Sequence, residues 1–325
     1  MEFFVNKSSV RNLQSAPAVA RETAKISGRP VLFHLFDFMG AILFHGCSDN
    51  QYLNEVFFRL RSFDRRNTIT KCRKDKICTL FNDKDYAPYF SDKVLFNKTF
   101  KDFVKRNWIY TRETSREQLD AFINKHSRII VKPIDQNKGK GIRLLDKNNF
   151  TESIVSHLLS EDVLLEECIT QHPDMIFGNK SVNSIRVITV LDGYGNVHIL
   201  KAGLRCGVGE AIVDNFSAGG VLYPLNLEGG FVDGYGEVGG HYEYGGIHPG
   251  TDCIMMGRTI PHWDKVINVV EKAAQLIPQI RYVGWDVAIL KDDVELIEGN
   301  NGPGCTLLEC VGGKRGFYKE ILSYL

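Results

Sequence analysis

Several features that would assign this chain to a familiar class are missing from its sequence. None of its eight cysteines belongs to a Cys-x2-Cys pair, so we expect neither a zinc site nor a disulfide framework, and scattered thiols suit a reducing cytoplasm. Charge of one sign is not in excess, because 40 Lys and Arg residues stand against 39 Asp and Glu residues and leave a net charge of +1. We therefore expect no global field that would recruit nucleic acid, and any attraction for phosphate has to be local.

Long apolar runs and a secretory leader are also missing. The first 20 residues contain no apolar run between a basic start and a small-residue cleavage site, which favours a cytoplasmic protein. The most apolar segment, residues 31–44, is interrupted by Asp37 and Gly40 and is shorter than the roughly 20 residues that cross a bilayer. We expect a core helix here in preference to a membrane-surface contact, and no stable membrane insertion.

What the sequence does contain is enough apolar material for two lobes. Single cores rarely grow beyond roughly 250 to 300 residues, and this chain has 325 residues with 43% hydrophobic content. Periodicity predicts helices over 50–70, 93–108, 150–159 and 263–276, and strands over 128–133, 142–145, 163–169, 184–190, 197–204, 282–290 and 294–298. Residues 229–250 hold nine glycines mixed with tyrosines and histidines, a composition that indicates a folded insertion or lid and not a flexible linker.

Three oxygen-bearing side chains near the C-terminus carry the strongest chemical signal. Asp286 precedes Glu298 by twelve residues, and a tight turn between their strands would place the two acids opposite each other. Asn300 follows two residues later and shares a face with Glu298, because side chains alternate along a strand. Hard oxygen donors suit Mg²⁺. A solvated strand end is the alternative, but apolar neighbours favour the metal site because buried unpaired carboxylates are costly.

Cationic residues elsewhere suggest contacts with phosphate. Lys132 ends a buried strand, and the Gly139-Lys140-Gly141 loop that follows would bring backbone amides to the same phosphates. The loop lacks the Walker spacing, so a plain hairpin turn remains an alternative. Arg186 and Arg205 interrupt two apolar strands, which is typical of a clamp on a transferring phosphoryl group, although surface arginines would look the same.

The order of these motifs over roughly residues 90 to 310 resembles the ATP-grasp superfamily. Shorter runs resemble, more narrowly, the sugar-transfer-associated ATP-grasp family, which is proposed to act in polysaccharide biosynthesis; these runs are residues 171–173, 183–186, 214–220, 248–249 and 284–286. The resemblance implies an α+β ATP-grasp fold, in which two α/β lobes clasp ATP. Here it implies a small lobe over 91–165, a large lobe over 166–325 and, before them, a mainly helical N-terminal region over 1–90.

The resemblance also implies roles for single residues. Lys93 and Lys132 would contact the ATP phosphates and the loop of Gly139, Lys140 and Gly141 would cover them. The stretch of Glu166, Glu167 and Ile169 would bind adenine, and the catalytic residues would be Arg186, Arg205 and Asn215. The metal ligands would be Asp286, Glu298 and Asn300, holding two Mg²⁺ ions with Mn²⁺ as a substitute.

Three functions are compatible with these residues. The favoured one is a ligase that activates a small-molecule or saccharide carboxylate as an acyl phosphate and joins it to an amine, with no nucleic-acid partner and with oligomer formation left open. The second is a kinase of a sugar or polyol hydroxyl, for which His241, His248 or Asp252 would be the general base. The third is a nucleotide-binding protein without turnover. The helical region before residue 91 departs from the usual N-terminal domain of the better-known ligases, so acceptor binding cannot be carried over from them.

Overall fold

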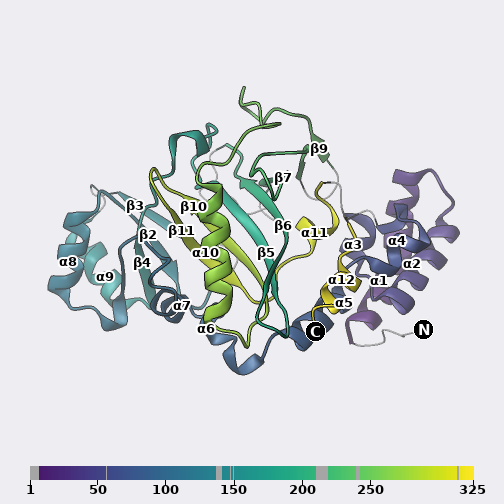
Figure 1. Ribbon diagram of the computed structural model, residues 1–325, viewed down its shortest axis with the longest axis horizontal. Helices are drawn as coiled ribbons and strands as arrows, with labels where there is room; N and C mark the ends of the chain where they lie inside the picture. The colour runs from purple at the N-terminus through teal and green to yellow at the C-terminus, as the bar shows by residue number, and fades with distance from the viewer. Residues whose placement is uncertain are drawn as a thin grey trace.

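Two antiparallel sheets and a helical N-terminal region make up the computed structural model (Figure 1). The structure describes residues 7–55, 57–136, 141–146, 148, 150–209, 219–238, 242–312 and 315–325. The four-stranded sheet lies at one end of the molecule, the seven-stranded sheet in the middle and the N-terminal helices at the other end (Figure 1).

The smaller sheet has the strand order β1-β4-β2-β3, and every pair in it is antiparallel. Its strands are β1 (Trp108–Tyr110), β2 (Arg128–Pro133), β3 (Arg143–Asp146) and β4 (Val163–Glu167). Helices α8 (Arg116–Lys125) and α9 (Glu152–Ser160) pack on it through a core that includes Leu119, Phe122, Val155 and Leu158. The strand pair β2–β3 confirms the predicted hairpin, whereas residues 137–140 at its tip lie outside the described residues.

The larger sheet has the strand order β11-β10-β5-β6-β7-β8-β9. Its strands are β5 (Ser184–Leu191), β6 (Val197–Cys206), β7 (Val221–Leu225), β8 (Gly236–Val238), β9 (Tyr242–Tyr244), β10 (Tyr282–Ile289) and β11 (Val294–Asn300). Helix α10 (Trp263–Leu276) covers one face through the main core, which also takes in residues of α7 (Lys93–Thr99). On the opposite face a second core joins α5 (Lys71–Phe81), α11 (Thr306–Glu309) and α12 (Tyr318–Leu322) to the sheet.

The glycine-rich stretch 229–250 is a folded part of this sheet. It contributes β8 and β9, which continue the sheet beyond β7. Gly230 has a φ of 60°, and a Cβ atom there would lie 2.1 Å from Cγ of Trp263, so this turn requires glycine. The insertion predicted from composition is therefore confirmed as folded structure.

The N-terminal region is helical, but its middle differs from the prediction. It contains α1 (Lys7–Ser27), α2 (Val31–His45), α3 (Asp49–Leu53), η1 (Phe57–Arg59), α4 (Ser62–Asn67) and α5. The single helix expected over 50–70 is wrong: the backbone is extended at Arg61 (φ −70°, ψ 158°) before α4, and the carbonyls of Phe58 and Leu60 accept from the Arg65 side chain. Helix α2 forms as expected, but it is buried on one face only, at His34, Phe38, Ala41 and Ile42.

The helix expected over 93–108 is also wrong in extent, since α7 ends at Thr99. Beyond it the chain turns, and the backbone N–H groups of Lys105 and Arg106 donate to the Glu295 carboxylate at 2.9 and 3.0 Å. This long-range acceptor replaces the carbonyls that a continuing helix would offer. The remaining short elements are η2 (Lys84–Tyr86), α6 (Pro88–Ser91), η3 (Thr111–Glu113) and η5 (Pro173–Met175).

All eight cysteines are among the described residues, and all are free thiols. Among the described helices, no single one has both the length and the apolar character needed to cross a membrane. Residues 12–27 of α1 satisfy that criterion only in combination with α2, and the two helices are bent by 120° where they join.

Candidate nucleotide and metal site

The hairpin of β10 and β11 brings the three predicted oxygen donors to one edge of the larger sheet. Asp286 pairs with Glu298 in the strand register, and Asn300 pairs with Gly284, so the predicted pairing of the two acids is confirmed. Asn300 Nδ2 donates to Glu298 Oε1 at 3.0 Å. Because the amide nitrogen of Asn300 is the donor in this hydrogen bond, its amide oxygen is the atom that can act as a metal ligand.

Two arginines from neighbouring strands hold the Asp286 carboxylate. Arg186 on β5 donates through Nε to Oδ1 at 2.5 Å and through Nη2 to Oδ2 at 2.7 Å, and Arg205 on β6 donates through Nη1 to Oδ2 at 2.8 Å. Asp286 is only 3% exposed. Burial alone would raise its pKa, but Arg186 and then Arg205 outweigh burial and hold the pKa of Asp286 well below its ordinary value.

Glu298 is shifted in the opposite direction. Desolvation and the neighbouring charge of Asp286 raise the pKa of Glu298 above its ordinary value. The Glu298 side chain is nevertheless exposed to solvent, where a cation can reach it. A bound cation would offset the repulsion between Glu298 and Asp286. Two carboxylates whose ionised forms repel each other at one sheet edge are a setting in which a divalent cation lowers the electrostatic energy.

These residues fit Mg²⁺, with a restriction at Asp286. A carboxylate has about four lone-pair sites, and three of those of Asp286 already accept from arginines, while Glu298 interacts with the same carboxylate. Glu298 and Asn300 supply the more accessible oxygens. Few protein ligands are enough, because Mg²⁺ usually completes its octahedron with water and phosphate oxygens.

The two lysines expected to contact phosphate lie near this hairpin. Lys93, at the start of α7, donates to the carbonyls of Pro133, Ile134 and Gln136 at 2.9, 3.2 and 2.6 Å. Burial and the charge of Lys132 lower the pKa of Lys93, while Glu298 acts to raise it. Lys93 is therefore close enough to sense both the second lysine and the acid of β11.

Lys132 is held by Glu166, with which it forms a salt bridge at the end of β2. Glu166 is 2% exposed and also accepts from Asn97 Nδ2 at 3.0 Å. Although burial would raise it, the charges of Arg106 and Lys132 keep the pKa of Glu166 well below its ordinary value. The Glu166 side chain thus positions a lysine in this structure, and the contact of this backbone stretch with adenine stays a prediction.

Arg106 joins the smaller sheet to β11, a role that was not predicted from the sequence. Its guanidinium pairs with Glu166 through Nε at 3.0 Å and with Glu295 through Nη1 at 3.1 Å. It also donates to the carbonyls of Leu296 and Ile297 at 2.8 and 3.2 Å, directly before Glu298. One arginine in a polar turn looks like a surface residue in sequence. Glu295 inside an apolar strand was the available signal that a buried cation had to exist.

The other predicted nucleotide contacts are only partly described. Gly139, Lys140 and Asn215 lie outside the described residues. Gly141 is described and has a φ of 70°, and a Cβ atom there would meet Gln136 Oε1 at 2.8 Å, so the end of the loop requires glycine. At the end of β4, Glu167 accepts from the backbone N–H and Nδ2 of Asn107, and Ile169 follows, partly buried.

Of the residues considered as a kinase base, His248 is already engaged by other groups. His248 is 1% exposed, and its Nδ1 and Nε2 are engaged by the Tyr223 hydroxyl at 3.0 Å and the Gly207 carbonyl at 2.9 Å. Neither ring nitrogen is left for an acceptor hydroxyl. Asp252 is exposed in the loop after β9, and His241 lies outside the described residues.

Comparison with known proteins identifies the arrangement at family level. A family model described as sugar-transfer associated ATP-grasp matches residues 72–321. No curated protein matches the sequence.

Solved structures give more distant likenesses. The ATP-grasp ligase PsnB, complexed with a minimal precursor, Mg and ADP, is 13% identical with a TM-score of 0.47, over 75% of this chain and 61% of that chain. D-alanyl-alanine synthetase A from Vibrio cholerae O1 biovar eltor str. N16961 is 14% identical with a TM-score of 0.43, over 73% of this chain and 65% of that chain. The chain thus spans less than two thirds of either relative, and the family model carries the assignment.

Proposed function

The chain belongs to the sugar-transfer associated ATP-grasp family, and we propose that it is an ADP-forming ligase that activates a carboxylate with ATP and Mg²⁺ and joins it to an amine. The observation that carries this proposal is the ionic set on one face of the larger sheet. Asp286 and Glu298 are paired across a hairpin, and Arg186 and Arg205 converge on the first of these acids. Such a set can bind a metal-bound triphosphate and neutralise charge that develops on a transferred phosphoryl group.

The proposed reaction needs no covalent intermediate on the protein. A carboxylate oxygen of the substrate attacks the γ-phosphorus, the bond to the β-phosphate oxygen breaks, and ADP leaves. The amine nitrogen then attacks the acyl carbon of the acyl phosphate, phosphate leaves with the C–O bonding electrons, and the nitrogen loses a proton to solvent. Positioning and charge neutralisation by fixed side chains supply the catalysis.

Each side chain of the set has a stated task in this proposal. Lys132 and Lys93 bind the phosphates, and Glu166 holds Lys132 in place until they arrive. Glu298, Asn300 and Asp286 would hold Mg²⁺, which when bound would shield the charge of the triphosphate. Arg205 and Arg186 orient the transferred group, and Asn215 and the 139–141 loop are proposed to assist.

The substrate class rests on the family alone. We propose a small-molecule or saccharide carboxylate and an amine partner, with a role in the synthesis of polysaccharides or sugar conjugates. A binding site for the acceptor is proposed to lie on the larger lobe, over residues 166–325, beside the ionic set.

Trapping with hydroxylamine tests the proposal. Hydroxylamine converts an acyl phosphate to a hydroxamate, whereas a phosphorylated alcohol does not react. Candidate uronic acids and amino acids should be incubated with enzyme, Mg-ATP and hydroxylamine, and the expected products are a hydroxamate, ADP and free phosphate. If a stable phosphate ester forms, with neither hydroxamate nor free phosphate, the ligase proposal is wrong and the kinase alternative takes its place.

A further inference from the structure

Exposed apolar side chains are concentrated in the N-terminal helices. Sixteen large hydrophobic residues are exposed among the described residues, and seven of them fall between residues 26 and 63. These seven are Ile26, Val31, Leu32, Phe33, Phe36, Phe44 and Phe63. Scattered single apolar residues on a surface need no explanation, but a cluster on neighbouring helices marks an interaction surface.

Helix α2 is apolar on both of its faces, although only one of them is covered. His34, Phe38, Ala41 and Ile42 face the N-terminal core, whereas Leu32 and Phe36 are 66% and 69% exposed. A helix that is hydrophobic all round is normally buried all round. The outer face of α2 therefore lacks a cover within the described residues.

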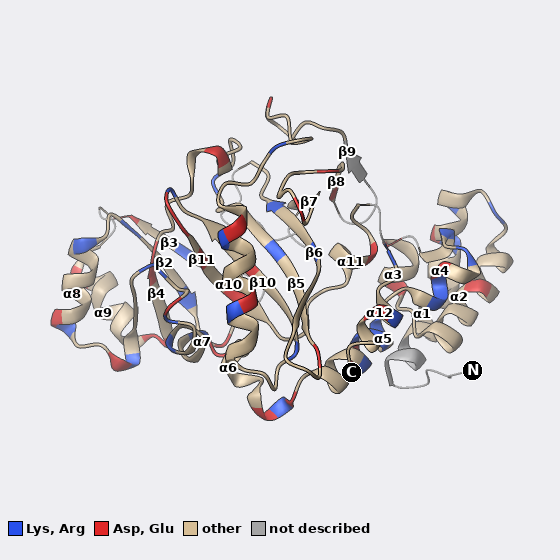
Figure 2. Ribbon diagram, viewed as in Figure 1, with Lys and Arg blue, Asp and Glu red and all other residues tan. Residues whose placement is uncertain are grey.

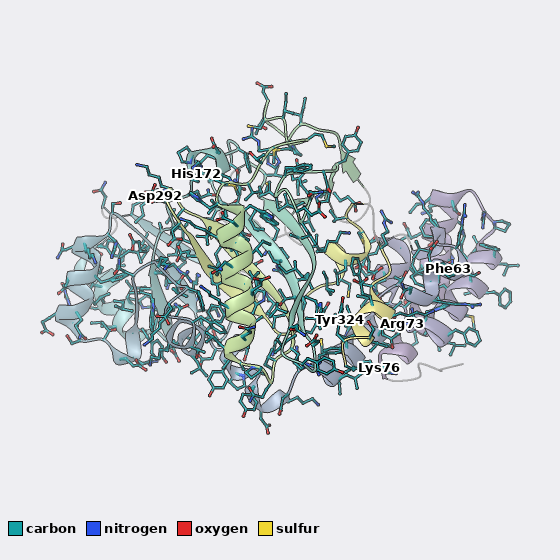
Figure 3. The ribbon with its side chains drawn as sticks, in the orientation of Figure 1. Phe63, Arg73, Lys76, His172, Asp292 and Tyr324 are labelled. Atoms are coloured by element: carbon teal, nitrogen blue, oxygen red, sulfur yellow. The ribbon has the colours of Figure 1, made fainter. Side chains whose placement is uncertain are left out.

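The one charged residue in α2 does not make the outer face polar. Asp37 accepts from Arg65 Nη1 and Nη2 at 2.7 and 2.9 Å and from the Tyr52 hydroxyl at 2.7 Å. These bonds neutralise Asp37 and hold α4 against α2. Phe63 of α4 is 78% exposed, so this helix, which Arg65 holds against α2, adds an exposed aromatic ring to the N-terminal region (Figure 3).

Exposed arginines lie next to the apolar face in the chain. Arg29 precedes α2 and lies over the ring of exposed Phe33, with 5.0 Å from Cζ to the ring centroid. Exposed Arg61 directly precedes α4, and exposed Arg66 lies on α4 after Phe63 and Asp64, in the part of the N-terminal region where Figure 2 shows basic residues. An apolar face with a basic border is the pattern of a helix that lies in a membrane interface.

We propose that α2 and α4 form a peripheral binding surface for an anionic lipid bilayer. At about 1.5 Å per residue, the 15 residues of α2 span roughly 22 Å, which suits a helix lying along the interface and not crossing it. The aromatic and aliphatic side chains enter the acyl boundary, and the arginines contact anionic headgroups. A second copy of the chain is a poorer occupant, because a two-fold contact brings the same basic border against itself.

Vesicle flotation tests this surface with the full chain. Vesicles of phosphatidylcholine alone should bind weakly, and vesicles in which about a third of the lipid is phosphatidylglycerol should bind more tightly, in a salt-sensitive way. Leu32→Ser with Phe36→Ser should weaken binding to anionic vesicles by about a hundredfold, since each buried apolar side chain contributes about tenfold or more. Arg61→Gln with Arg66→Gln should weaken it by about tenfold or more.

A matched control distinguishes this surface from general stickiness. Tyr194 is 94% exposed at the tip of the β5–β6 hairpin, and Tyr194→Ser should bind vesicles like the unchanged chain. Circular dichroism should show that all variants keep their fold. The proposal is overturned if anionic vesicles do not bind the unchanged chain. It is equally overturned if the Leu32 and Phe36 variant leaves vesicle binding intact but dissociates an oligomer, which would assign the face to a protein partner.

Discussion

Replacing Arg106 with Met should test whether one buried guanidinium couples the two sheets. The substitution keeps an aliphatic side chain but removes two salt bridges and two hydrogen bonds to carbonyls. Glu166 would retain the ammonium of Lys132, whereas Glu295 would retain two backbone N–H donors but no side-chain cation among the described residues. Both acids stay buried, so the variant carries a poorly compensated charge.

Removing one partner of a buried ion pair typically lowers the free energy of unfolding by about 3 to 5 kcal/mol. We expect a loss in the lower half of that range, because Lys132 still compensates Glu166. Urea unfolding followed by tryptophan fluorescence would measure it, since Trp108 lies in the smaller sheet and Trp285 in the larger one. The double variant Arg106→Met with Glu295→Gln should regain part of the loss, because the uncompensated charge is then removed.

Arg116 provides the matched control. It pairs with Glu152 and Asp120 on the surface of the same lobe, and Arg116→Met should leave the urea midpoint nearly unchanged. A loss below about 1 kcal/mol for Arg106→Met, the range of an exposed pair, would refute the coupling. So would a double variant no more stable than Arg106→Met itself.

Four further results are expected. Glu298→Gln should abolish ATP turnover but leave the metal-free protein at least as stable to urea, because it removes repulsion from Asp286; full turnover would contradict the metal assignment. Lys132→Met should weaken ATP binding by roughly ten- to a hundredfold in calorimetry, and unchanged affinity would exclude a phosphate contact. Arg205→Ala should lower hydroxamate formation by about a hundredfold or more, and an unchanged yield would remove it from catalysis. Because the pKa of Glu166 is depressed, ionised Glu166 stabilises the fold above its ordinary pKa of 4.5, and this stabilisation is lost as the pH falls. In Glu166→Gln the free energy of unfolding should therefore decrease less steeply as the pH is lowered below 4.5, and the same steepness as in the unchanged chain would contradict this role of Glu166.

Several parts of the fold could be predicted because the information is local. The β10–β11 hairpin follows from two apolar runs around a tight turn, and its period-two alternation sets which residues face Asp286. The amphipathic pattern of α10 matches its predicted bounds. The expected α+β ATP-grasp fold with a helical N-terminal region is confirmed by the family match and by the two sheets.

Other features could not be predicted, because they depend on partners distant in sequence. The helix starting at Lys93 ends early since Glu295, about 190 residues away, accepts the N–H groups of residues 105 and 106. The helix expected over 50–70 is likewise divided into α3, η1 and α4, and Arg65 of α4 pairs with Asp37 of α2, 28 residues away. Periodicity reports neighbours within a few turns of the chain and carries no information on such contacts.

By itself, the sequence determined which chemical groups are present and their spacing along strands: two acids twelve residues apart, an amide two residues later and arginines in two apolar runs. Only the tertiary structure decided how they are used. In the fold, Arg186 and Arg205 pair with Asp286, Glu166 pairs with Lys132, and the outer face of α2 is exposed. The physical reason is that a charge or an apolar face takes its role from whichever group covers it, and that group is selected by packing between elements distant in the chain.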